Sequence, residues 1–229
     1  GAYAKEYLAN RGLKDETLTK FGIGYSLRDK DALYRTFGGD YALEDLTDAG
    51  LVLNIGANEV RDRFRGRLMF PIFNESGKVV GFGGRRMYDE STEEAKYINS
   101  PETPVFSKGR ELYGLFEARQ ALRDKGYALV VEGYMDVVAL AQSGFSNAVA
   151  TLGTACTADH VQKLFRFTDA VVFSFDGDAA GRRAAGRALE AALPHATDLR
   201  TVRFLFLPPE HDPDSFVREL GAAAFDEQI

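Results

Sequence analysis

The chain has 229 residues, a formal net charge of −6 at pH 7 and a hydrophobic fraction of 45%. This length fits one large domain or two small ones and is enough to bury a stable core. The single cysteine, Cys156, and three scattered histidines exclude an internal disulfide and a zinc ribbon, and no apolar run approaches the about 20 residues of a membrane span. We expect a cytoplasmic protein without zinc or a membrane partner, and the acidic total argues against a protein that coats DNA.

Helices are predicted along much of the N-terminal part, where apolar side chains recur at helical spacing over residues 2–13, 15–21 and 43–50. No cluster of titratable groups occurs in these segments. The chain begins without methionine, and residues 220–229 read as a helix that stops short. We therefore expect an excised piece of a longer chain.

Residues 61–86 form a basic strip in this acidic chain, with seven basic side chains against two acidic ones. Two strand-like runs lie within the basic strip and are joined by a hairpin-type loop at 74–77. Arginine recurs at every second position at its start, so we expect these side chains to line one face of a strand. They either protect a solvated sheet edge from aggregation or attract phosphate groups. The arginines are Arg61, Arg63, Arg65 and Arg67.

A polar loop is expected over residues 88–109, because this stretch has too few apolar residues for regular structure. A helix is expected over residues 110–126. From residue 127 onward, near-continuous apolar runs alternate with amphipathic segments, which predicts a parallel sheet covered by helices on both faces. The predicted strands are 127–133, 147–153, 170–178 and 201–208, and the predicted helices are 135–144, 157–167 and 179–193.

Carboxylates follow two of these strands. Asp176 and Asp178, with Gly177 between them to let the backbone turn, end one strand, and Glu132 ends another, with Asp136 one helical turn later. Parallel sheets bind ligands beyond the carboxyl ends of their strands. Asp178 could instead cap the next helix, and Glu132 could simply be solvated. Two carboxylates about 5 Å apart repel by roughly 3 kcal/mol at an effective dielectric constant of about 20, so we interpret the pair as ligands of a hard cation, Mg²⁺ or Mn²⁺.

A second acidic pair, Asp212 and Asp214, follows the last predicted strand. The residue before a proline is usually extended, and Asp214 could cap a helix over 215–220. The residues alone leave the choice between a cap and a functional pair open.

The order of these acids along the β-α units resembles the Toprim domain of DnaG-type primases, topoisomerases and some nucleases. The wider sequence narrows the resemblance to bacterial DNA primases, over nearly the whole chain. The segments that follow one another as they do in that family are RFRGRLMFPI, GFGGR, KYINSPETPVFSKG, LYGLFEA, VVEGYMDVVALAQSG, LGTACTADH, FDGDAAGR and DPD.

The resemblance implies an α/β fold in which an α+β N-terminal subdomain precedes a Toprim parallel sheet flanked by helices. We expect a basic N-terminal subdomain at 1–126, a Toprim metal-binding subdomain at 127–209 and the start of a C-terminal helical segment at 210–229. The family's zinc-binding domain and the domain that contacts the replicative helicase are not encoded in this sequence.

The activity implied is that of a DNA-directed RNA polymerase, a nucleotidyltransferase that joins ribonucleoside triphosphates into short RNA primers on single-stranded DNA at a bacterial replication fork. Two metal ions would hold the attacking hydroxyl and the leaving pyrophosphate. The expected catalytic residues are Glu132, Asp176 and Asp178, and the expected metal ligands are these three with Asp136, Asp212 and Asp214. The residues expected to contact template or nucleotide are Arg63, Arg65, Arg67, Arg85, Lys96, Asn99 and Lys108.

Three questions stay open at this point. Glu132 is either a metal ligand or the base that assists deprotonation of the attacking hydroxyl. A Toprim nuclease or topoisomerase would share the acids but would not need the region from the basic strip to residue 114. A non-catalytic DNA-binding scaffold would not need the intact acids.

Overall fold

The computed structural model describes residues 1–229 except 57–58, 89–94 and 177, and it divides into two compact units. The first unit comprises Gly1–Ile72 and Val79–Ser107, and the second comprises Phe73–Lys78 and Lys108–Ile229. The chain therefore passes between the units more than once. The expected division at residues 126 and 209 stays a prediction. None of the helices in the described ranges has the length and apolar character needed to cross a membrane.

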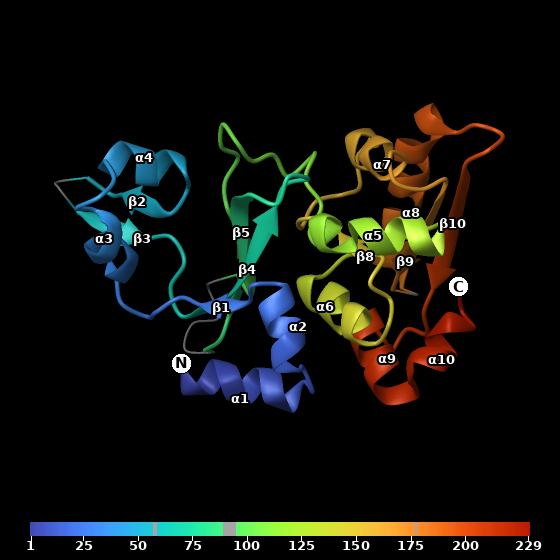
Figure 1. The fold of residues 1–229 in the computed structure, drawn as a ribbon, viewed down its shortest axis with the longest axis horizontal. Coiled ribbons are helices and arrows are strands. Elements are labelled where there is room, and N and C mark those ends of the chain that lie inside the picture. The colour runs from blue at the N-terminus through green and yellow to red at the C-terminus, as the bar shows by residue number, and fades with distance from the viewer. Residues whose placement is uncertain (57–58, 89–94, 177) are drawn as a thin grey trace. The chain divides into compact units, whose positions relative to one another are not determined.

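The first unit begins with short helices, as predicted (Figure 1). A helix at 32–37 and the short strands before and after the expected basic hairpin escaped prediction. Its elements are α1 (Ala2–Asn10), α2 (Asp15–Lys20), β1 (Gly24–Tyr25), α3 (Ala32–Phe37), α4 (Leu43–Asp48), β2 (Val52–Asn54), β3 (Val60–Asp62), β4 (Arg67–Phe73), β5 (Val79–Arg86) and β6 (Tyr97–Asn99). In the described residues, β1-β4-β5-β6 form one sheet and β2-β3 another.

The prediction that the arginines from 61 to 67 share one strand is wrong. β3 ends at Asp62 and β4 begins at Arg67 in a different sheet. The buried Asp62 carboxylate accepts the backbone N–H groups of Leu33 (2.7 Å) and Tyr34 (3.1 Å), which ties this point of the chain to the start of α3. Gly66 takes a left-handed conformation with φ of 60° directly before β4 begins, so the connection from β3 to β4 is not extended.

Two further differences concern the stretch after the hairpin. β6 lies within the expected loop 88–109, and its residues pair antiparallel with β5, with Gly83 opposite Asn99 and Arg85 opposite Tyr97. The expected helix at 110–126 begins later, as α5 (Leu115–Lys125), because Tyr113 forms a bridge to Ala150 instead. Gly126, at φ 74°, ends α5 with the left-handed residue that often follows a helix.

The hairpin between β4 and β5 is confirmed, and its turn belongs to the second unit. The Asn74 Oδ1 atom accepts the backbone N–H groups of Ser76 (3.1 Å) and Lys78 (3.0 Å). Arg119 donates to the Glu75 carbonyl at 2.9 Å, and the Glu75 carboxylate pairs with Arg166. The turn is thus held by side chains of the second unit and not only by its own strands.

The second unit contains the predicted parallel sheet. After α5 come β7 (Ala128–Val131), α6 (Tyr134–Gln142), β8 (Ala148–Ala150), α7 (Ala158–Leu164), β9 (Ala170–Phe175), α8 (Ala179–Ala192), the 3₁₀ turn η1 (Leu193–His195), β10 (Thr201–Phe206), α9 (Pro213–Leu220) and α10 (Ala222–Asp226). The strands pair in parallel in the order β10-β9-β7-β8. Every predicted strand and helix between residues 127 and 208 is therefore confirmed.

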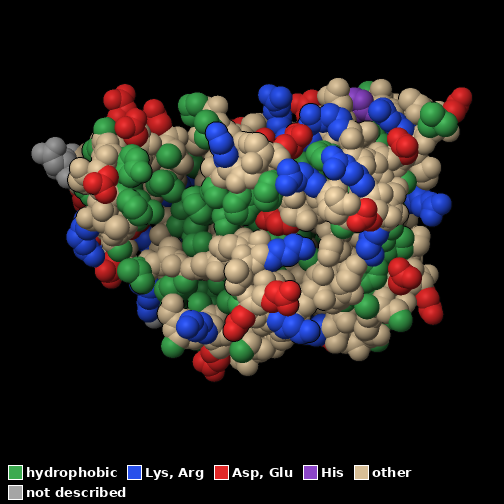
Figure 2. Space-filling model, viewed as in Figure 1, with side chains coloured by type: hydrophobic (Ala, Val, Ile, Leu, Met, Phe, Trp, Pro, Cys, Tyr) green, Lys and Arg blue, Asp and Glu red, His purple; other side chains and the backbone are tan. Residues whose placement is uncertain are grey.

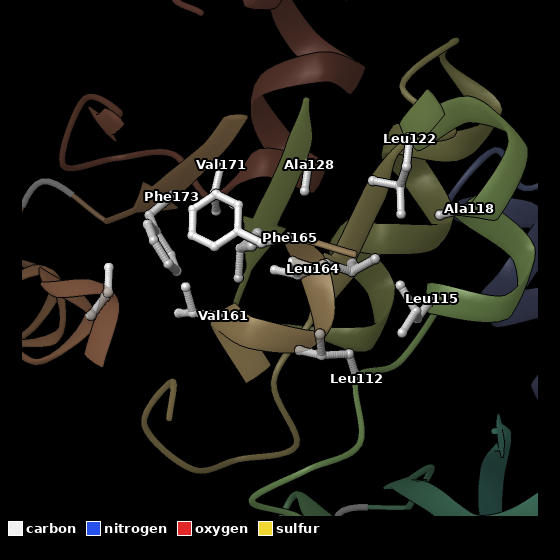
Figure 3. Close-up of a cluster of buried hydrophobic side chains, with 14 of the residues drawn as sticks. Leu112, Leu115, Ala118, Leu122, Ala128, Val161, Leu164, Phe165, Val171 and Phe173 are labelled. Carbon is white, nitrogen blue, oxygen red and sulfur yellow. The ribbon is translucent and has the colours of Figure 1, made fainter. Parts of the chain in front are cut away.

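The core of the second unit lies between one face of this sheet and helices α5, α7 and α8. Alternate residues of β7 and β9, among them Val130 and Phe173, face that side, as side chains of a strand alternate between faces. Figure 3 shows Val161 and Leu164 of α7 lying in this cluster with Val171 and Phe173 of β9. On the side of α6, Phe145, Phe216 and Phe225 form edge contacts that hold α9 and α10.

An apolar hollow of about 380 Å³ opens in the first unit, where Figure 2 shows hydrophobic side chains gathered on a hollowed part of the surface. Its lining includes Leu33, Phe37, Phe64, Met69 and Phe82. None of the predicted site residues lines it.

Candidate functional site

The predicted acids follow two neighbouring parallel strands of the second unit. β7 and β9 pair with Val130 opposite Phe173, so their carboxyl ends meet at one edge of the sheet. Glu132 comes directly after β7, and Asp176 comes directly after β9. Gly177, which was expected to turn the backbone between the two aspartates, lies outside the described residues. The prediction that Glu132 and Asp176 follow neighbouring strands is confirmed, and their role as site residues stays a prediction.

Asp178 is the N-cap of α8. Its Oδ1 atom accepts the backbone N–H of Gly181 at 2.7 Å, so the capping interpretation is confirmed. The cap occupies one carboxylate oxygen, and the side chain is exposed. The second oxygen can therefore still meet a cation, so a cap and a ligand are compatible roles for Asp178.

Burial and neighbouring negative charges raise the pKa values of Glu132 and Asp176. Partial burial and then the negative charges of Asp176 and Asp178 raise the pKa of Glu132, while the guanidinium of Arg187 partly offsets the rise. Burial and then Asp212 and Asp178 raise the pKa of Asp176. A positive ion at this edge would relieve the repulsion and lower these pKa values again.

Asp136 lies in the first turn of α6 and contacts the first turn of α9. Its Oδ1 atom accepts the backbone N–H of Asp214 at 3.1 Å. Burial, and after it the charge of Asp212, raises the pKa of Asp136 to about 8. The carboxyl group is therefore largely protonated near neutral pH, and its position connects the starts of two helices.

The second acidic pair is divided between two structural roles. Asp212, not Asp214, caps α9: its Oδ1 accepts the Ser215 N–H at 2.7 Å, and Ser215 Oγ accepts the Asp212 N–H at 3.0 Å. The suggestion that Asp214 caps this helix is wrong, because Asp214 follows Pro213 inside the first turn. Asp214 is only 3% exposed, and its carboxylate lies 3.6 Å from Arg218.

A hollow of about 320 Å³ opens beside Glu132. The residues after β7 and β8 form its walls with α8, and Phe173 and Phe175 line it. Arg187 of α8 also lines it, which explains how its charge reaches Glu132. Sequence reasoning did not single out Arg187, because its place beside Glu132 depends on how α8 packs.

The donor set at this edge fits a divalent metal ion in kind. All candidate ligands are carboxylate oxygens, which Mg²⁺ and Mn²⁺ prefer. In the described parts of the chain, no three His, Cys, Asp or Glu side chains come close enough to form a metal cage. Mg²⁺ commonly uses one or two carboxylates and completes its shell with water and phosphate oxygens, so a closed cage is not required.

The predicted basic residues fall into both units. In the first unit, Arg63 donates from Nη2 to the Asn99 carbonyl at 2.9 Å, and Arg85 lies opposite Tyr97 on the paired strand β6. Lys96 directly precedes β6 and is exposed, and Arg65 is partly exposed in the connection to β4. The structure thus brings Arg63, Arg85, Lys96 and Asn99 together around β5 and β6, whereas Lys108 lies in the second unit.

Arg67 differs from its neighbours because it is buried, with 4% of its surface exposed. Its Nη1 atom donates to the backbone carbonyls of Gly84 (3.2 Å) and Ala95 (3.1 Å). A guanidinium in this position holds the chain before β6 against β5. We therefore assign Arg67 a structural role rather than the predicted contact with nucleic acid.

Known proteins resemble this chain along its whole length. The family described as the N-terminal domain of the DNA primase catalytic core matches residues 1–119, and the Toprim domain matches residues 126–203. The chain belongs to the DnaG-type DNA primase family. It is 52% identical over 228 residues to a DNA primase of Pseudomonas aeruginosa and 50% identical over 227 residues to that of Escherichia coli K12, and each match covers 99% of this chain.

Solved primase structures share the fold. The E. coli primase catalytic core matches with a TM-score of 0.93 at 50% identity, over 99% of this chain and 72% of that one. A DnaG primase catalytic domain bound to single-stranded DNA matches with a TM-score of 0.92 at 50% identity, over 99% and 70% of the two chains. The chain spans only 34% and 39% of the length of the P. aeruginosa and E. coli relatives. Divalent metal use is a general property of Toprim domains and of this family.

Gly181 is a second site residue that sequence reasoning did not single out. A Cβ atom there would lie 1.9 Å from the Asp176 carbonyl oxygen, so only glycine allows α8 to start this close to Asp176.

Gly181→Ala should displace Asp176, lower the free energy of unfolding by about 1–3 kcal/mol and weaken Mn²⁺ binding. Gly186→Ala is the matched control, because no atom lies within 4 Å of a Cβ there and alanine should be neutral or stabilising in a helix. Urea unfolding and Mn²⁺ calorimetry measure both effects, and equal values for the two variants would contradict this role.

Asp136 should make the metal-free protein less stable as pH rises. Folding raises its pKa from 3.8 to about 8, so the stabilisation from the protonated carboxyl is fully present below 3.8 and is lost as pH rises through about 8. Asp136→Asn keeps an acceptor for the Asp214 N–H and cannot ionise, so its advantage over wild type should grow with pH. Urea unfolding in a chelator across this range tests it, with the exposed Asp198→Asn as control. A stability difference that does not change with pH would refute the assignment.

Proposed function

We propose that this chain is the RNA-polymerising core of a DNA primase, which joins ribonucleoside triphosphates into short RNA primers on a single-stranded DNA template. The observation that carries the proposal is the pairing of β7 with β9, which brings Glu132 and Asp176 to one edge in a member of the primase family. A relative bound to single-stranded DNA supports the choice of template. The chain spans 34% of the length of the P. aeruginosa relative, so the activity of the whole protein is part of this proposal.

The reaction needs charge stabilisation more than covalent chemistry. A 3′-hydroxyl attacks the α-phosphate of an incoming nucleotide, the new phosphodiester forms and pyrophosphate leaves. Divalent metal ions, when bound, would offset the charge that builds on the phosphate oxygens. We propose Mg²⁺ or Mn²⁺ rather than zinc, because the candidate ligands are carboxylates and the chain has one cysteine.

Different carboxylates at the edge serve different purposes in this proposal. Asp176 and the free oxygen of Asp178 hold the metal. Glu132 has a raised pKa, which suits either a ligand that releases its proton on metal binding or a base, and both roles remain open. Asp136, which binds the Asp214 N–H, supports the site from α6. Asp212 and Asp214 are weaker ligands.

In this proposal the basic residues bind the template and the nucleotide. Arg63, Arg85, Lys96 and Asn99, grouped around β5 and β6, would contact phosphate and base groups together with Arg65 and Lys108. We further propose that the full-length protein reaches the replicative helicase through a domain outside this sequence and works at the cytoplasmic replication fork. The division into subdomains at 1–126, 127–209 and 210–229 belongs to the same proposal.

Asp176→Asn should abolish primer synthesis and weaken Mn²⁺ binding, because it removes a charged ligand of the metal. The fold should stay intact, because the lost charge is one that the neighbouring acids repel. Asp169→Asn, at the opposite end of β9, is exposed and should behave as wild type. Primer formation from labelled ribonucleotides on single-stranded DNA measures the effect. Full synthesis by the Asp176 variant would refute the metal assignment. DNA cleavage in place of synthesis would favour a Toprim nuclease, and DNA binding without either reaction would favour a scaffold.

Lys96→Ala should weaken binding of single-stranded DNA and flatten its salt dependence. Each lost phosphate contact lowers the slope of log affinity against log salt by about 0.7 for single strands. Lys125→Ala is the matched control, because Lys125 is an exposed lysine at the end of α5 and is not among the predicted basic residues. Fluorescence anisotropy of a labelled oligonucleotide over a salt series gives both slopes. Identical slopes for Lys96→Ala and wild type would exclude a phosphate contact at Lys96.

A further inference from the structure

Two side chains at the start of α7 hold the backbone where the chain enters the second unit. The His160 Nε2 atom lies 2.9 Å from the Lys108 carbonyl oxygen, and Thr157 Oγ1 donates to the Gly109 carbonyl at 2.6 Å. Lys108 and Gly109 are the first residues of this unit after the hairpin segment. Consecutive carbonyl groups are thus fixed by residues about fifty positions later in the chain.

The same two side chains form the capping box of α7. Thr157 is the N-cap and accepts the His160 N–H at 3.2 Å, while the Thr157 N–H donates to His160 Nδ1 at 3.1 Å. Because Nδ1 accepts a hydrogen bond, the ring proton of the neutral imidazole is on Nε2 and is donated to the Lys108 carbonyl. His160 therefore completes the cap and clamps the entering chain at once.

The choice of histidine is informative. A capping box usually has glutamate or glutamine at this third helical position. Glutamate would accept the Thr157 N–H but has no donor for the Lys108 carbonyl when ionised. The cap alone does not require histidine, whereas the cap together with the clamp requires a side chain that accepts at one atom and donates at another.

The clamp rests on a rigid support. His160 is fully buried, and burial is the main cause of its lowered pKa. The charge of Lys163 also lowers this pKa. Hydrogen bonds with the backbone of Lys108 and Glu111, and the charge of Asp159, raise it in part. Val161 and Leu164, on the same helix, lie in the core between α7 and the sheet (Figure 3). The sheet that carries Glu132 and Asp176 and the backbone of Lys108 are thereby connected through α7.

We infer that His160 and Thr157 are positioning residues for Lys108. A lysine ammonium sits on a flexible four-carbon stem, so the position of its backbone limits where the charge can reach. By fixing that backbone, the clamp keeps the Lys108 ammonium within reach of a phosphate group near the acidic strand ends. The inference rests on the proposed function, in which Lys108 contacts nucleotide or template.

Binding of labelled single-stranded DNA tests the functional half. Thr157→Val removes the hydroxyl at nearly constant volume and should weaken binding about three- to tenfold, as expected for a lost hydrogen bond that positions a charge. Thr157→Ser keeps the hydroxyl and should stay within about twofold of wild type. His160→Leu and His160→Gln form a second pair, because glutamine can both accept and donate. In a Lys108→Ala background, none of these changes should weaken binding further, since the group they position is gone.

Limited trypsin digestion tests the structural half without any binding or activity. Trypsin cleaves after lysine, and the clamp should protect the Lys108–Gly109 bond. Thr157→Val and His160→Leu should speed cleavage at this bond, while the serine and glutamine variants should not. His195→Leu, a histidine in η1 outside the clamp, is the control. Circular dichroism and urea unfolding show that each variant is folded before digestion.

The outcomes separate this inference from the proposed function. If Lys108→Ala leaves DNA binding unchanged, the proposed contact of Lys108 with template is refuted, and the inference about His160 and Thr157 is refuted as well. If Lys108→Ala weakens binding but the clamp variants do not, the proposed function stands and the inference is overturned. The inference is also overturned if the clamp variants speed cleavage at Lys108 while binding stays at the wild-type level.

Discussion

The parallel pairing of β7 with β9 is the constraint on which the candidate site depends. Both strands are buried, so their register is fixed by the apolar side chains that they share with α5, α7 and α8. That register brings the residue after each strand to the same edge, and both of these residues are acids. The repulsion between them is thus a consequence of core packing, and the folding energy of the core offsets it.

Three of the acidic side chains lie at helix starts. Asp178 caps α8, Asp212 caps α9, and Asp136 meets the first turn of α9 from the first turn of α6. The backbone N–H groups at helix starts carry partial positive charge, so each carboxylate gains a favourable partner before any cation is present. The acids therefore serve the fold and the chemistry together, and a change at one of them should be tested on both.

Local patterns predicted the sheet and its acids, but they did not predict contacts made across the chain. The strands of the second unit are continuous apolar runs, and Glu132 and Asp176 follow them directly, so both were predictable. The break between β3 and β4 depends on Asp62 binding the start of α3, and the burial of Arg67 depends on carbonyl groups beyond residue 83. The cap of α9 was ambiguous because two aspartates flank one proline, and the clamp at His160 joins residues 52 positions apart.

The hairpin turn between β4 and β5, which belongs to the second unit, limits how this unit can be produced as a separate fragment. Residues 73–78 are separated along the sequence from the rest of their unit by Val79–Ser107, which include β5 and β6. A fragment cut to the Toprim match at 126–203 would lose this turn, α5 and the two C-terminal helices. The core cluster would then lose Leu115, Ala118 and Leu122 of α5, and Arg166 would lose Glu75. A fragment with this one continuous stretch of sequence therefore exposes part of this core, and a fragment that keeps the whole unit must join two separate stretches of the chain.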